Sequence, residues 1–111
     1  MDITKDTATR AKEFIVKNAK PLAKASSEKS YLESFLKSKL ALLMSESTET
    51  TMAGKEMYAK AHPDYIALLH GIKAAQELEV ELRWKMEAAK ITVEIYRTES
   101  ANNRTIDRAM Q

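Results

Sequence analysis

The segment from Pro63 to about Asn102 is the feature that most constrains what this chain can fold into. It contains one glycine, Gly71, and no proline after its first residue, so it predicts a single unbroken helix. At 1.5 Å per residue that helix would be about 60 Å long. Apolar residues recur along it at spacings of three and four, which places them on one face, here named the first stripe. The first stripe consists of Leu68, Gly71, Ala75, Leu78, Leu82, Met86, Ala89, Val93 and Tyr96.

A second apolar face lies about 200° around the axis of the same predicted helix and is named the second stripe. Charged residues, Glu79 among them, fill the sectors between the two faces. A helix with two apolar faces needs packing partners on both sides, and the rest of the chain is too short to cover both. We therefore predict a homodimer that pairs through the second stripe. The second stripe consists of Val80, Trp84, Ala88, Ile91 and Ile95.

The rest of the chain predicts shorter helices that pack on one half of the long one. Pro21 either ends the first of these helices or begins the second. The expected fold is a single all-α domain, a bundle of three shorter helices on a long C-terminal helix that extends into an antiparallel or coiled-coil-like dimer. The expected helices span residues 3–19, 24–45, 51–61 and 63–102, and residues 103–111 form a polar tail that frays.

Helix boundaries are indicated by small hydroxyl residues and by a proline. The run from Ser45 to Thr51 favours a loop, because such side chains compete for backbone hydrogen bonds. Either Thr50 or Thr51 is placed to cap the third helix. His62 is expected to act as a cap residue before Pro63, which suits the first position of a helix.

Composition limits the classes to which the protein can belong. With only two glycines, two prolines and no cysteine, the chain is typical of helical proteins and cannot form disulfides or thiolate metal sites. The longest apolar run, Leu40 to Met44, is far too short to cross a membrane. The first residues lack a basic start followed by an apolar block, so we expect no signal peptide, no membrane partner and a cytoplasmic location.

Motifs for catalysis, cofactors and metals are weak. Two Ser-x-x-Lys sequences, at Ser26 and Ser34, lack the other elements that accompany this spacing in serine acyl-transferases. His62 and His70 are eight residues apart, too far along a helix to share a zinc ion. The chain has no Glu-x-x-His and no phosphate-binding glycine loop. We therefore expect neither an enzyme nor a cofactor or metal site.

The net charge of +2 is unevenly distributed. Residues 1–40 hold nine Lys and Arg against five Asp and Glu, whereas the remaining residues hold nine against eleven. Solvated lysines on amphipathic helices explain this pattern most simply, and phosphate binding is the alternative. Trp84 between Arg83 and Lys85 could stack on a base, but its place in the second stripe favours packing. The candidate phosphate contacts are Lys17, Lys20, Lys24, Lys37 and Lys39.

Two stretches together carry a resemblance. One is Tyr31–Met44, and the other runs from Glu56–Tyr65 through Leu69–Gly71 to Leu82–Trp84. The chain resembles, over about residues 25–100, small helical proteins of uncharacterised function that tailed phages and prophages encode, often near recombination or early genes. The resemblance assigns no functional residue. It implies a phage early-region protein in a bacterial host cell.

Two functions follow as expectations. The first is a non-enzymatic interaction protein with a protein partner, acting as an accessory factor of phage DNA recombination or replication. The alternative is a protein that binds single- or double-stranded DNA directly through its basic N-terminal third.

Overall fold

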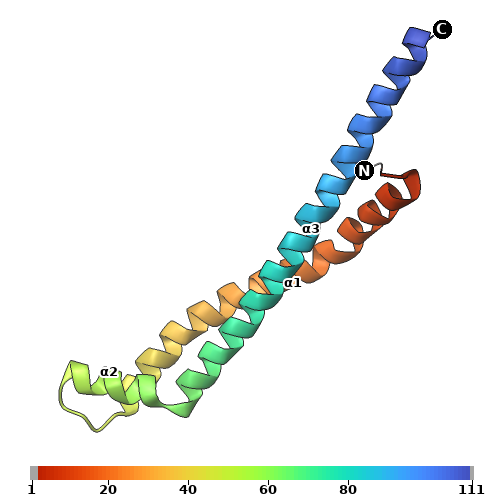
Figure 1. Cartoon of the computed structure of the whole chain (residues 1–111). Coiled ribbons are helices and arrows are strands. Elements are labelled where there is room, and N and C mark those ends of the chain that lie inside the picture. Colours follow the sequence, from red (N-terminus) through yellow and green to blue (C-terminus); the bar gives the residue numbers. More distant parts are fainter. Residues whose placement is uncertain (1–2, 111) are drawn as a thin grey trace. The chain divides into compact units, whose positions relative to one another are not determined.

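The computed structural model describes residues 3–110, and the chain is all-α over that range (Figure 1). Helix α1 spans Lys5–Glu46, α2 spans Met52–Ala61 and α3 spans Pro63–Met110. No strand occurs among these residues. The predictions of an all-α protein and of a long C-terminal helix are confirmed.

Helix α1 corrects the predicted number of helices. The two helices expected over residues 3–19 and 24–45 form one continuous helix, and Pro21 lies inside it. The prediction of a helix boundary at this proline is wrong. An interior proline removes one backbone hydrogen bond and costs roughly 3 kcal/mol. Ala8 before the proline and Ala25 after it are both buried, so α1 packs on both sides of Pro21 within the respective units.

The end of α3 corrects a second prediction. The tail over residues 103–111 was expected to fray, but the helix continues to Met110, and Gln111 lies outside the described residues. Thr105 follows the helical pattern, since its hydroxyl donates to the carbonyl oxygen of Ala101 at 3.0 Å. Residues 101–110 are all exposed, so this last part of the helix has no apolar packing that hydrophobic periodicity could reveal.

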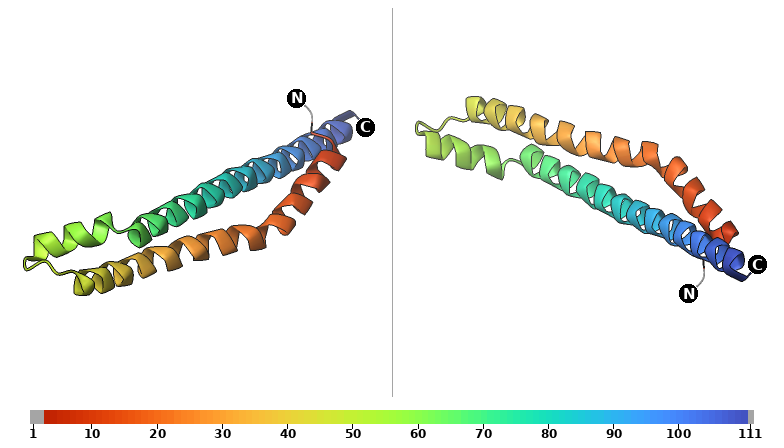
Figure 2. Two further views of the ribbon diagram at one scale, coloured as in Figure 1. Left: turned by 90° about the horizontal axis from the view of Figure 1, so that it is seen from below. Right: turned by 90° about the horizontal axis from the view of Figure 1, so that it is seen from above.

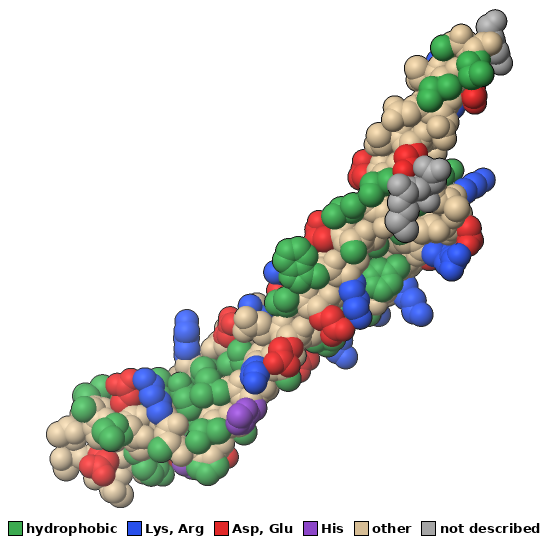
Figure 3. Space-filling model, viewed as in Figure 1, with side chains coloured by type: hydrophobic (Ala, Val, Ile, Leu, Met, Phe, Trp, Pro, Cys, Tyr) green, Lys and Arg blue, Asp and Glu red, His purple; other side chains and the backbone are tan. Residues whose placement is uncertain are grey.

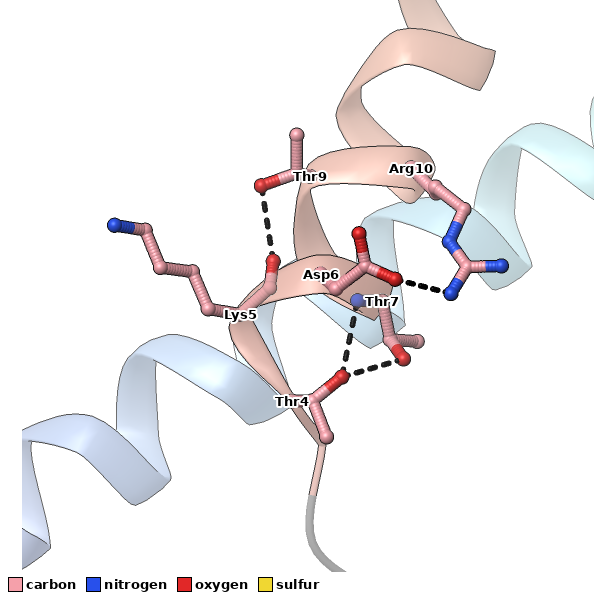
Figure 4. A network of polar contacts seen from close by, with 6 residues as sticks. All are labelled: Thr4, Lys5, Asp6, Thr7, Thr9 and Arg10. Carbon is pink, nitrogen blue, oxygen red and sulfur yellow. Dashed lines mark hydrogen bonds and ion pairs between the residues drawn. The ribbon is translucent and has the colours of Figure 1, made fainter.

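A network of polar side chains caps the start of α1 (Figure 4). The Thr4 hydroxyl accepts the backbone N–H of Thr7 at 3.1 Å, which is the geometry of an N-cap. Asp6 in the first turn pairs with Arg10, one turn further on. A carboxylate in the first turn also complements the helix dipole. The first residues of α1 are therefore locally well specified.

The loop and caps around α2 follow the sequence prediction. The loop predicted by the hydroxyl run begins after Glu46, and the Thr51 hydroxyl caps α2 by accepting the N–H of Gly54 at 3.0 Å. His62 ends α2, and its Nδ1 accepts the backbone N–H of Asp64 at 3.0 Å. Pro63 is the first residue of α3. The cap predictions at the threonine and the histidine are confirmed.

The chain forms two compact units, each of which is described separately. Unit 1 contains residues 1–22 and 80–111, and unit 2 contains residues 23–79. In unit 2, the later part of α1 lies antiparallel to the start of α3, with α2 connecting them (Figures 1 and 2). Leu43 and Ala59 are buried in this unit. Gly71 faces Leu32, where an added Cβ would lie 3.6 Å from the leucine Cδ1.

In unit 1, the start of α1 lies antiparallel to the second half of α3 (Figure 2). Ala8 from α1 is buried, as are Met86 and Ala89 from α3. The backbone N–H of Ile3 donates to Glu99 Oε2 at 2.9 Å. This long-range bond fixes the beginning of the described chain against α3.

The first stripe is largely the packed face of α3, with one correction. Met86 and Ala89 are buried, and most other members are half-buried. Leu78, however, is 49% exposed, whereas Glu79 is only 5% exposed. The sequence places Glu79 in a charged sector between the two stripes, but the packed face passes one residue further along the helix at this point and buries it.

Candidate interaction surfaces

The second stripe is exposed in the single chain. Trp84 is 71% exposed and Ile91 is 57% exposed, and Val80, Ala88 and Ile95 are also exposed. All five residues lie in unit 1 on α3. Hydrophobic side chains are visible at the surface along much of the chain (Figure 3). A large indole and two isoleucines on one helical face form an apolar patch of the kind that marks interaction sites.

Trp84 was expected to be packed against another helix. Its own chain leaves it 71% exposed, so burial by a second helix stays a prediction. The neighbouring Lys85 ammonium lies 2.9 Å from Glu81 Oε1, one turn earlier on α3. This is an i, i+4 pair of the kind that stabilises an exposed helix face.

A shallow surface depression of about 480 Å³ adjoins the second stripe. Ile91 and Ile95 contribute its apolar part, and its charged lining residues are Glu87, Glu94, Glu99 and Lys90. The arrangement can accept an apolar side chain from a partner helix. Three carboxylates outnumber the single ammonium of Lys90, which disfavours an anionic ligand at this position.

The candidate phosphate contacts do not form one surface within a unit. Lys17 and Lys20 belong to unit 1, and Lys24, Lys37 and Lys39 belong to unit 2. Four of the five are exposed, but Lys39 is half-buried and its Nζ lies 3.3 Å from Asp64 Oδ2. An ammonium that already holds a carboxylate is poorly placed to bind phosphate.

Unit 1 also contains a cationic groove that sequence analysis did not find. Lys12 on α1 lines it together with Arg97 and Arg104 on α3, and the groove measures about 370 Å³. Its remaining lining residues are Val93, Tyr96 and Ser100. Lys12 and Arg97 are far apart in the sequence, so neither local spacing nor charge density along the chain indicates their proximity.

The histidines and acidic residues give no metal centre in the part of the chain that the structure describes, because no three His, Cys, Asp or Glu side chains gather there. His62 serves as a cap, and His70 is exposed. A hydrogen bond from Lys60 to Glu56, 2.6 Å long, raises the pKa of this surface lysine. No helix within residues 3–110 is long and apolar enough to cross a membrane.

No protein-family model, curated protein or solved structure matches this chain. The features of this chain that bear on function are two surfaces of unit 1, the second stripe and the cationic groove.

Proposed function

We propose that the protein is a non-enzymatic interaction protein that forms a homodimer through the second stripe. The observation that carries this proposal is the 71% exposure of Trp84 on the same helical face as Ile91. The hydrophobic effect favours removing such a face from water.

A second copy of the chain is the occupant that suits the stripe best. Trp84 lies toward one end, Ile91 and Ile95 lie toward the other, and the small Ala88 lies between them. In an antiparallel two-fold pair, the indole of each copy meets the isoleucines of the other, and the alanine lets the two helices approach closely. Such an isologous interface closes on itself and leaves no unpaired half.

The length of the stripe determines how strong this pairing should be. From Val80 to Ile95 the helix advances about 22 Å. This is short for a permanent interface, so we expect a reversible dimer with a dissociation constant in the micromolar range.

The cellular role that we propose is that of an accessory factor of phage DNA recombination or replication. Its support is the resemblance of residues 31–44 and 56–84 to small helical phage proteins that are often encoded near recombination or early genes. A small dimer with apolar and cationic surfaces, and with a separate protein partner, suits an adaptor. The alternative through the N-terminal lysines has less support, because those residues are divided between the two units.

The decisive experiment measures oligomeric state by sedimentation velocity and light scattering from low to high micromolar concentration. The wild type should change from monomer to dimer over this range. Ile91→Glu combined with Ile95→Glu should stay monomeric, because pairing would bury four carboxylates without partners.

The matched control is Val16→Glu. Val16 is a 78% exposed apolar residue in unit 1 but on α1, outside the second stripe. This variant should dimerise as the wild type does. A wild type that remains monomeric at the highest concentration contradicts the proposal, as does a stripe variant that retains the dimer mass.

A further inference from the structure

The cationic groove of unit 1 is built by two segments that are distant in the sequence. Lys12 comes from the third turn of α1, and Arg97 and Arg104 come from the second half of α3. The bond between the Ile3 N–H and Glu99 holds the start of α1 against this part of α3. Ala8, one turn before Lys12, is buried. Lys12 therefore lies close to the side of α1 that packs in unit 1.

The cations in the groove are available to a ligand. Among the residues that the structure describes, neither Lys12 nor Arg104 is ion-paired. Arg97 Nη1 lies 3.4 Å from Glu94 Oε1, but both side chains are mostly exposed. An exposed pair of this kind is weak, and the guanidinium keeps further N–H donors.

The surrounding charge has the same sign. Residues 1–22 and 80–111 contain eleven Lys and Arg against eight Asp and Glu, a balance of +3. Residues 23–79 contain seven against eight, a balance of −1. The positive charge of the protein is therefore concentrated in the unit that holds the groove, which would steer an anionic ligand toward it.

We infer that this groove binds the phosphate backbone of single-stranded nucleic acid. Arg97 and Arg104 lie on one face of α3, two helical turns and about 10 Å apart along the axis, so the positive charge extends along the groove. A chain of phosphates can contact both. Exposed cations gain little binding free energy from a single hydrated anion. On a polyanion, each contact releases condensed counterions, and this release favours binding. These contacts carry no base information, so binding is independent of sequence.

This proposal does not depend on the dimer. The groove residues and the second stripe occupy different faces of α3, since Arg97 lies about 120° around the helix from Ile91. The monomeric variant Ile91→Glu with Ile95→Glu should still bind through its own groove. Failure of dimerisation and failure of nucleic-acid binding are therefore separate results.

The test measures fluorescence anisotropy of a labelled oligothymidylate as a function of salt concentration. The groove variant combines Lys12→Gln, Arg97→Gln and Arg104→Gln. The matched control combines Lys24→Gln, Lys37→Gln and Lys73→Gln, which removes the same charge from exposed positions of unit 2. Circular dichroism should show that both variants remain folded, because all six side chains are exposed.

Three phosphate contacts to a single strand contribute about −2 to the slope of log affinity against log salt, which is about a hundredfold in affinity at ~0.1 M salt. The groove variant should lose this contribution to the slope and this hundredfold in affinity. The control should retain the wild-type slope. The inference is overturned if the wild type does not bind at low salt, or if the control loses as much affinity as the groove variant. Equal competition by polyglutamate and unlabelled oligothymidylate also overturns it, because the groove would then accept any polyanion.

Discussion

Trp84→Ala separates the stability of the single chain from the stability of the proposed dimer. The indole is 71% exposed in the single chain, so its removal should cost the folded monomer less than about 1 kcal/mol. Pairing would have a much larger effect. A buried tryptophan hides roughly 150–250 Å². The exposed share is therefore roughly 100–180 Å² per copy, or about 2.5–4.5 kcal/mol at ~25 cal/mol/Å².

Even half of the gain from two copies would change the dissociation constant by about a hundredfold to a thousandfold. Trp84→Ala should therefore leave the melting temperature of a dilute sample nearly unchanged and prevent dimerisation at micromolar concentration. In the wild type, Trp84 is the only tryptophan, so its fluorescence reports on this surface alone. The emission maximum should shift to the blue as concentration rises, with the same midpoint as the change in sedimentation.

Val16→Ala is the control, because this exposed valine lies outside the second stripe. It should change neither the sedimentation midpoint nor the emission. A wild-type emission maximum that stays red at every concentration, together with an unchanged mass for Trp84→Ala, would refute the reasoning and remove Trp84 from the interface.

Two further predictions concern the fold. Leu43 is 1% exposed and its neighbour Leu42 is 55% exposed. In urea denaturation, Leu43→Ala should lower the free energy of unfolding by about 2–5 kcal/mol, and Leu42→Ala by less than about 1 kcal/mol. Equal losses would contradict the packing of unit 2. Pro21→Ala should raise the free energy of unfolding by up to about 3 kcal/mol, because it restores a backbone hydrogen bond inside α1; a lower melting temperature would show that the proline stabilises its surroundings.

The parts of the fold that sequence predicts well are those set by local chemistry. The loop before α2, the Thr51 cap and the start of α3 at Pro63 each depend on one or two side chains and their own backbone. The exposure of the second stripe is equally accessible to prediction. Two faces about 200° apart cannot both be covered by one antiparallel neighbour, and the structure leaves the second face uncovered by its own chain.

The structure differs from the sequence predictions where tertiary packing outweighs local preference. Proline favours a helix boundary, yet α1 passes through Pro21 because the residues on both sides pack against α3 within their own units. Periodicity assigned Leu78 to the packed face, but a small drift of that face around α3 buries Glu79 instead. Such a drift is smaller than one residue spacing around the helix, so a pattern of apolar positions cannot resolve it.

The cationic groove shows a different limit. Charge counted along the sequence indicates that the first forty residues are the basic region. In the folded chain, however, residues 1–22 belong to the same unit as residues 80–111. Lys12 gains its neighbours Arg97 and Arg104 only through the antiparallel return of α3. Because the second stripe lies on another face of α3, the proposed dimer would leave the groove of each copy accessible. One dimer would then present two grooves to a single strand, and the apolar and cationic surfaces of α3 would act together without sharing a residue.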